Sequence, residues 1–219
     1  MKLEIRNAES RDVPEIKRLI DVYIAEDYYS LEELEALSAV CRSADMRLYV
    51  DGARLAYALA TPANDVALKD LARLCDAFYI GGTKCGALLG EAVLFPKPAI
   101  APHFFTIVKQ HGALLAKGRV AGIQFDTLFT DGLYGEVGRN AIDAANRIRA
   151  ALDAKGYAQP VVAPTNQIFV ALSPERAKAL SRRVEMGFWE NLEDGRTVMR
   201  IATSWATDPE DVDRLIELL

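Results

Sequence analysis

The stretch "DAFYIGGTKCGALLGEAVLF", residues 76–95, places one lysine, Lys84, in a run made mostly of small and apolar residues. Two short apolar runs, 77–80 and 91–95, flank a glycine-rich segment that contains the lysine. This order predicts a strand, a turn and a second strand. A buried ammonium costs free energy unless a partner stabilises it or its charge is removed. The stretch therefore predicts a lysine in a tight, largely apolar site, held there for a chemical reason.

The residues before this stretch alternate between helix and strand. Ser30, with Glu33 three residues later, has the spacing of a capping box and predicts the start of a helix. A short strand at 47–50 and a helical stretch at about 66–75 follow. Residues 30–95 thus give helix, strand, helix, strand, strand. This pattern is typical of an α/β sheet whose strands are buried on both faces.

The pattern changes after residue 95. A long helical region is predicted at about 101–131, and another helix near 136–155 stops at Gly156. Four residues of the second helix share an apolar face: Ala141, Ala145, Ile148 and Leu152. An α+β pattern then follows, with a strand at 167–172, a helix from Pro174, a strand at 197–203 and a last helix entered at Asp208-Pro209. We place a domain boundary near 132–138.

Composition and charge exclude several classes of function. The net charge is -5, so a basic face for nucleic acid is not indicated. The apolar runs are too short to span a bilayer, and no charged-then-apolar signal segment opens the chain. Cys41, Cys75 and Cys85 are widely spaced and form no CxxC pair. Such a set favours free thiols in a reducing cytoplasm over a disulfide framework or a metal site.

Charged residues follow two of the predicted strands. Asp51 and Arg54 come after the strand at 47–50, and Lys84 comes after the strand at 77–80. One strand-helix-strand unit separates these ends, so both are expected at the same edge of one sheet, where α/β proteins bind ligands. The residues are also consistent with a surface ion pair between Asp51 and Arg54 and with a simple turn lysine at position 84.

Four stretches together resemble a known family: "YVDGARLAYAL", "CDAFYIGGTKCGALLGEAVLF", "PTNQIF" and "MRIATSWAT". They look like the low-specificity L-threonine aldolase and aromatic amino acid β-eliminating lyase group, from about Tyr29 to the C-terminus. The GGTK lysine with DGAR upstream is the specific part of the match. The resemblance implies pyridoxal 5'-phosphate (PLP) as the cofactor. It also implies the α/β, aspartate-aminotransferase-like fold of PLP-dependent transferases, with an incomplete large domain and a small α+β C-terminal domain.

The resemblance further implies roles for individual residues. Lys84 matches the catalytic lysine that forms a Schiff base with the cofactor, which would explain its place in an apolar turn. Asp51 matches the acid that binds the pyridine nitrogen and keeps the ring protonated. Arg200 matches the arginine that holds the substrate carboxylate through a two-donor fork. Without the resemblance, Arg200 is more typical of a solvated arginine on an edge strand. The other implied contacts are Arg54 near the cofactor ring, Lys109 and Lys117 near its phosphate, and Asn166 at the substrate.

The first residues depart from the family. "MKLEIRNAESRDVPEIKRLIDVYI" resembles the first strand and helix of a GNAT-type acetyltransferase, but the glycine-rich turn that binds acetyl-CoA is not seen, so acetyl transfer is rejected. The family's long N-terminal segment, with its phosphate loop and stacking ring, is also not seen. We therefore expect an N-terminally truncated or hybrid chain. Its predicted parts are a strand–helix cap over 1–28, a partial PLP-binding domain over 29–135 and a small domain over 136–219.

Two functions remain open at this point. The first is a PLP-dependent lyase that cleaves small β-hydroxy amino acids, as a threonine aldolase does, or that eliminates a β-leaving group. The second is an inactive remnant that acts as an oligomeric binding module. The expected partners are a small amino-acid substrate and further copies of the chain, as a dimer or tetramer, with no nucleic acid and no membrane. The sequence does not choose between aldol cleavage and β-elimination.

Overall fold

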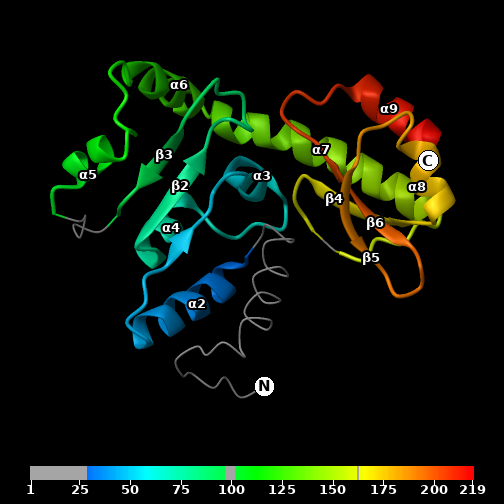
Figure 1. The fold of residues 1–219 in the computed structure, drawn as a ribbon, viewed down its shortest axis with the longest axis horizontal. Helices are drawn as coiled ribbons and strands as arrows, with labels where there is room; N and C mark the ends of the chain where they lie inside the picture. The colour runs from blue at the N-terminus through cyan, green and yellow to red at the C-terminus, as the bar shows by residue number, and fades with distance from the viewer. Residues whose placement is uncertain (1–28, 97–101, 162) are drawn as a thin grey trace. The chain divides into compact units, whose positions relative to one another are not determined.

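The computed structural model describes residues 29–96, 102–161 and 163–219 (Figure 1). These residues divide into two compact units, 29–140 and 141–219. The division falls within the long helix α7, Leu133–Ala154. The strand and helix that the sequence predicts within 1–28 lie outside the described residues.

The first unit is built on a three-stranded sheet with the order β1-β2-β3. Its strands are β1 (Tyr49–Val50), β2 (Ala77–Gly81) and β3 (Glu91–Leu94). β1 runs parallel to β2, whereas β3 runs antiparallel to it. All three strands lie where the sequence predicts them. The strands on either side of the Lys84 turn are therefore paired neighbours.

The prediction that these strands are buried on both faces is wrong. Phe78 and Ile80 of β2 are buried on one face of the sheet. On the opposite face, Tyr49 of β1 is 56% exposed and Val93 of β3 is 54% exposed. β1 and β3 are the two outer strands of this sheet, and outer strands of a small sheet are covered less completely than a central strand.

The described helices of the first unit are α2 (Leu31–Ser43), α3 (Leu55–Ala60), α4 (Leu68–Leu74), α5 (Phe104–Gln110), α6 (Arg119–Phe129) and the start of α7. The predicted capping box is confirmed: the Ser30 hydroxyl accepts from the Glu33 amide at 3.3 Å, and the Glu33 carboxylate accepts from the Ser30 amide at 2.8 Å. The short helix α3 was not predicted.

The single helical region expected at about 101–131 is in fact two helices. α5 ends at Gln110, and Gly112 adopts φ +69°, the left-handed conformation that commonly terminates a helix. α6 begins only at Arg119. Gly112 is the residue from which this break in the helical region could have been predicted.

The second unit is an antiparallel sheet with the order β4-β6-β5. Its elements are β4 (Gln167–Leu172), α8 (Pro174–Leu180), β5 (Gly187–Asn191), β6 (Thr197–Ala202) and α9 (Pro209–Leu218). All but β5 lie where the sequence predicts them. β5 is an edge strand with Phe188 63% exposed, so its sequence lacks the apolar-in, polar-out alternation of a half-buried strand.

The core of the second unit lies between α7, α8 and α9 and the β4–β6 pair. The predicted apolar face of α7 is confirmed, because Ala141, Ala145, Ile148 and Leu152 are all buried. The last three pack into a cluster with residues of both strands and both later helices, among them Ile168, Val170, Leu180, Ile201, Val212 and Leu215. Gly156 follows α7 at φ +75°, as its predicted helix-ending role requires. Within the described ranges, no helix combines the length and the apolar character that crossing a bilayer requires.

Candidate active site at the Lys84 turn

The carboxyl ends of β1 and β2 lie side by side because the two strands are parallel. Asp51 follows β1 directly, and Gly81 is the last residue of β2. The amide of Gly81 donates to the carbonyl of Gly52 at 2.8 Å, which joins the two segments just beyond the strands. The Asp51 segment and the Lys84 turn thus meet at one edge of the sheet, as the sequence predicts.

Two glycines permit this close approach. A Cβ atom on Gly52 would lie 1.8 Å from the carbonyl oxygen of Tyr79. A Cβ atom on Gly81 would lie 2.4 Å from the carbonyl oxygen of Ala53. Both contacts are with backbone atoms, which cannot move aside as the end of a flexible side chain can. The glycines of "DGAR" and "GGTK" therefore hold the two segments together.

The carboxylate of Asp51 is held on one oxygen. Its Oδ1 accepts from the Ala53 amide at 2.9 Å and from the Tyr79 hydroxyl. Burial and the hydrogen bond to Asp51 both raise the pKa of Tyr79 well above its usual range. The ring of Tyr49 stacks on that of Tyr79 with centroids 6.2 Å apart. In the described part of the chain no donor is bonded to Oδ2, so the second oxygen of this exposed side chain can accept from a ligand.

Lys84 is exposed, so the prediction of a buried lysine is wrong. Gly81 and Gly82 are buried, but the turn that begins at Thr83 projects beyond the end of β2 and exposes both Thr83 and Lys84. The backbone is nevertheless fixed, because the hydroxyl of Tyr57, a residue only 1% exposed, donates to the carbonyl of Lys84. The turn therefore presents an exposed amine on a held backbone.

Cys85 is the next residue, and its thiol is buried. Burial raises the pKa of Cys85 to about 11. At neutral pH the thiol therefore stays protonated, and a protonated thiol is a poor nucleophile. Of the two neighbouring reactive groups, the exposed amine of Lys84 is the one available to a ligand.

The other predicted cofactor residues lie at the start of α3, on α5 and before α6. Arg54 is the N-cap residue of α3 and is half-buried near Asp51 in the chain. Lys109 lies in the last turn of α5, and Lys117 lies in the connection to α6; both are exposed. Neither lysine shares a hydrogen bond or ion pair with the Lys84 turn among the described residues.

Arg200 and Asn166 both belong to the second unit. Arg200 lies on β6, the central strand of its sheet, so the edge-strand alternative is wrong. Its Nη1 donates to Oε1 of Gln167 at 3.2 Å, and its guanidinium lies 5.8 Å from the centroid of the Trp189 ring. The arginine is thus supported by a buried amide and an aromatic ring.

Asn166 is buried just before β4. Its Nδ2 donates to the carbonyl of Thr203 at 2.5 Å, while its Oδ1 is buried and has no hydrogen-bond partner among the residues that the structure describes. Arg149 of α7 holds the same segment, donating to the carbonyls of Ala163, Thr165 and Gln167. Burial lowers the pKa of Arg149. A buried unpaired carbonyl oxygen is uncommon in a folded chain and suits a site that receives a donor.

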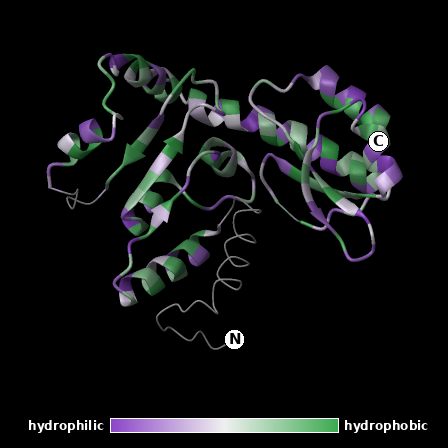
Figure 2. Cartoon of the chain, viewed as in Figure 1, coloured by the Kyte–Doolittle hydropathy of each residue, from purple (hydrophilic) through white to green (hydrophobic). Residues whose placement is uncertain are grey.

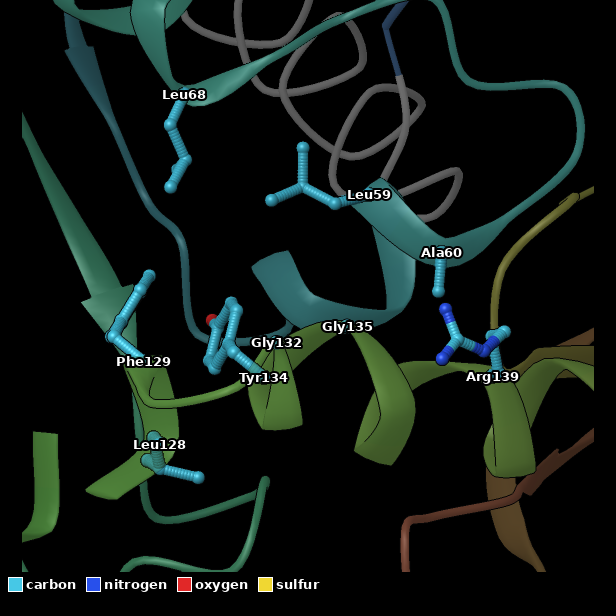
Figure 3. A pocket seen from close by; sticks show the side chains of 9 residues that line it. All are labelled: Leu59, Ala60, Leu68, Leu128, Phe129, Gly132, Tyr134, Gly135 and Arg139. Atoms are coloured by element: carbon cyan, nitrogen blue, oxygen red, sulfur yellow. The ribbon is translucent and has the colours of Figure 1, made fainter. Parts of the chain in front are cut away.

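A pocket of about 410 Å³ lies between residues of α3, α4, α6 and the start of α7 in the first unit (Figure 3). It is lined by Leu59, Ala60, Leu68, Leu128, Phe129, Gly132, Tyr134, Gly135 and Arg139. Tyr134 connects it to the site, because its hydroxyl donates to the carbonyl of Gly81 at 3.1 Å. Burial also raises the pKa of Tyr134 well above its usual range. The cavity wall is mostly apolar, and Lys84 is not part of it.

Sequence reasoning missed the side chains that support the site. The hydroxyl of Tyr79 donates to the Asp51 carboxylate, that of Tyr57 to the carbonyl of Lys84, and that of Tyr134 to the carbonyl of Gly81 at the end of β2. Val50 pairs with Phe78 in the parallel register of β1 and β2, which places Tyr79 beside Asp51, and the sequence does not show this register. Tyr57 and Tyr134 come from helices, and nothing in their local sequence indicates a long-range partner.

Comparison with solved structures defines the class of fold. A threonine aldolase from Leishmania major is 41% identical, with a TM-score of 0.83 over 87% of this chain and 56% of that chain. A serine palmitoyltransferase from Sphingomonas wittichii, 15% identical, has a TM-score of 0.61 over 84% of this chain and shares the fold. The chain therefore has the α/β, aspartate-aminotransferase-like fold of PLP-dependent enzymes, in part.

Sequence comparison then gives the family. The profile of the beta-eliminating lyase family matches residues 17–183, and the chain belongs to this family. This match begins at residue 17, whereas the resemblance seen in the sequence begins at about Tyr29. A low-specificity L-threonine aldolase from Pseudomonas aeruginosa is 31% identical over 189 residues, which is 85% of this chain and 54% of that protein. The chain thus spans about half the length of the curated relatives it matches.

Proposed function

We propose that this chain carries the lysine and carboxylate of a PLP-dependent lyase that cleaves small β-hydroxy amino acids, as threonine aldolases do. The observation that supports it most strongly is the meeting of Asp51 and the Lys84 turn at the adjacent carboxyl ends of β1 and β2. Ligands of α/β proteins bind at such an edge. The names of the relatives supply the reaction class.

The groups at this edge fit PLP. The cofactor carries an aldehyde, a protonated ring nitrogen and a phosphate, and when bound it accepts the electrons released as a bond to Cα of the substrate breaks. Lys84 offers an exposed amine for a Schiff base to the aldehyde. Asp51, held through Oδ1, offers its other oxygen to the ring N–H. We also propose that Arg54 contacts the ring of PLP and that Lys109 and Lys117 contact its phosphate. These assignments rest on the resemblance to the family.

Activity is tested directly with the purified chain and added PLP. The chain is incubated with threonine, allo-threonine and tyrosine, and glycine, acetaldehyde and pyruvate are measured. Glycine with acetaldehyde from the first two substrates supports aldol cleavage. Pyruvate from tyrosine would instead place the chain among β-eliminating enzymes. Absence of all products, with PLP fixed on Lys84, would instead support the non-catalytic binding module.

Arg200 is proposed to bind the substrate carboxylate. We expect Arg200→Ala to raise KM roughly 10- to 100-fold, because it removes a charge-assisted pair of hydrogen bonds. The visible band of bound PLP should remain, since Arg200 is not assigned to the cofactor. Steady-state kinetics with threonine measure the effect, and Arg214→Ala on α9 of the same unit is the matched control. An unchanged KM in the Arg200 variant would contradict the assignment.

We also propose that the chain acts as a homo-oligomer through an apolar surface of the first unit. This surface consists of exposed residues on β3, α5, α6, the β2–β3 connection and the α5–α6 connection: Leu88, Leu89, Val93, Phe105, Ile107, Leu114, Leu115, Val120, Ile123 and Phe129. Figure 2 shows hydrophobic residues along these segments in green. On α6, Leu128 is buried while Val120 and Ile123 are 42% and 57% exposed. Apolar surface of this kind marks an interface.

The oligomer is expected to dissociate when this surface is made polar. Light scattering coupled to size exclusion should give a wild-type mass of two or four times 24.1 kDa. The variant carrying Leu88→Glu and Ile123→Glu should shift to a single chain. Phe188→Glu, at a 63% exposed position of the second unit, is the control. A monomeric wild-type chain at micromolar concentration would contradict the proposal.

Three buried free thiols, Cys41, Cys75 and Cys85, agree with a reducing compartment. We therefore assign the chain to the cytoplasm, where PLP and free amino acids are available to it.

A further inference from the structure

Glu91 holds the two residues that precede Lys84. Its Oε2 accepts from the amide of Gly82 at 2.8 Å, and its Oε1 accepts from the hydroxyl of Thr83 at 2.9 Å. Both carboxylate oxygens are thus used on the turn. Hydrogen bonds to a charged acceptor are about twice as strong as those between neutral groups.

The position of Glu91 explains why a side chain is needed there. Gly81 and Glu91 form the last aligned pair between β2 and β3, so the backbone ladder ends at this point. Gly82 is buried, and its amide would otherwise lose its partner beyond the ladder. The carboxylate of Glu91, the first residue of β3, accepts the hydrogen bond from this amide. A Cβ atom on Gly82 would lie 3.0 Å from side-chain atoms of Ala87 and Phe125, so a larger residue there requires these side chains to shift by a few tenths of an ångström.

The turn is also held after Lys84. Tyr57 donates to the Lys84 carbonyl, and Gln124 of α6 accepts from the amides of Leu88 and Leu89. The segment between β2 and β3 is therefore fixed near both of its ends, while the amine of Lys84 stays exposed. Among these contacts, that of Glu91 is the charged one.

We propose that Glu91 is a positioning residue for Lys84, fixing the turn so that the amine faces the Asp51 edge. This inference rests on the proposed role of Lys84. Restricting a reactive group to one geometry speeds its reaction, because the entropy of orientation has already been lost on folding. Without the two hydrogen bonds of the Glu91 carboxylate, which we call the Glu91 clamp, Thr83 and Lys84 sample more conformations. The amine of Lys84 then faces the Asp51 edge less often.

The test measures the rate at which PLP, fixed by borohydride, labels Lys84, relative to Lys69 on α4 in the same molecules. Glu91→Ala should lower this ratio about tenfold, since two hydrogen bonds to a charged group are lost. Glu91→Gln, which keeps a carbonyl oxygen for the Gly82 amide, should lie between. Glu35→Ala, which breaks a 2.7 Å ion pair with Arg73 of α4, should leave the ratio unchanged.

A double-mutant cycle with Thr83→Val adds a second test. Because Thr83 and Glu91 share one hydrogen bond, their effects on the labelling ratio should be less than multiplicative. Amide hydrogen exchange at Gly82, measured without PLP, should be faster in Glu91→Ala than in the wild type and in Glu35→Ala.

The outcomes separate this inference from the proposed function. If PLP does not label Lys84 in the wild-type chain, the proposed function fails. The rate of amide hydrogen exchange at Gly82 still shows whether the Glu91 carboxylate holds the turn. If wild-type Lys84 is labelled and Glu91→Ala is labelled equally fast, the positioning role of Glu91 is overturned. If Glu91→Ala melts below the assay temperature, the ratio in Glu91→Gln decides, and a wild-type value overturns the role.

Discussion

Lys84→Ala is expected to abolish the visible absorption band that PLP gives with the wild-type chain and to lower the rate of threonine cleavage by a factor on the order of 10³ or more. The exposed amine of Lys84 is the group assigned to the cofactor aldehyde, and the neighbouring thiol of Cys85 cannot replace it. Burial raises the pKa of that thiol to about 11, which keeps it protonated and unreactive at neutral pH.

The measurement is a PLP titration followed by absorption, with glycine formation assayed on the same samples. Lys69→Ala removes another exposed lysine of the same unit and should behave as the wild type. Lys84→Arg keeps a positive charge but not a primary amine, so it should fail as Lys84→Ala does. A band of wild-type strength in either Lys84 variant would mean that another amine holds the cofactor.

Gly52→Ala should destabilise the first unit by more than about 3 kcal/mol. The new Cβ atom would lie 1.8 Å from the carbonyl oxygen of Tyr79, and the relief of that clash must separate β1 from β2. The hydrogen bond from the Gly81 amide to the Gly52 carbonyl would be lost with it. Because this bond joins the Asp51 segment to the Lys84 turn, PLP labelling of Lys84 should fall as well.

Urea unfolding followed by circular dichroism measures the change in stability. The matched control is Gly122→Ala in α6, where nothing lies within 4 Å of the new Cβ atom. Alanine has the higher helix propensity, so this variant should be more stable than the wild type by roughly 0.5–1 kcal/mol. Equal midpoints for Gly52→Ala and the wild type would contradict the close approach of the two segments.

Much of the fold could be predicted from local sequence. The capping box at Ser30, the apolar face of α7 and the helix entry at Asp208 are confirmed, because each depends on residues a few positions apart. β5 and α3 were missed for the opposite reason. β5 exposes Phe188, so its apolar residues do not all face the core, and α3 is only six residues long, which is less than two helical turns.

The site was predictable in part. The meeting of Asp51 with the Lys84 turn followed from strand order, since parallel neighbours end at the same edge. The exposure of Lys84 did not follow, because the composition of a turn does not fix where its side chains point. The contacts of Glu91 and Tyr57 could not be predicted either. They join residues brought together only by the antiparallel β2–β3 pair and by the packing of α3.

The most direct test of the account is the site of cofactor attachment. The purified wild-type chain is titrated with PLP, reduced with borohydride and digested, and the modified peptides are mapped by mass spectrometry. The account predicts a saturable yellow band and a single dominant modification on Lys84. Labels scattered over surface lysines such as Lys69 and Lys109, in proportion to their exposure, would show that this turn does not bind the cofactor.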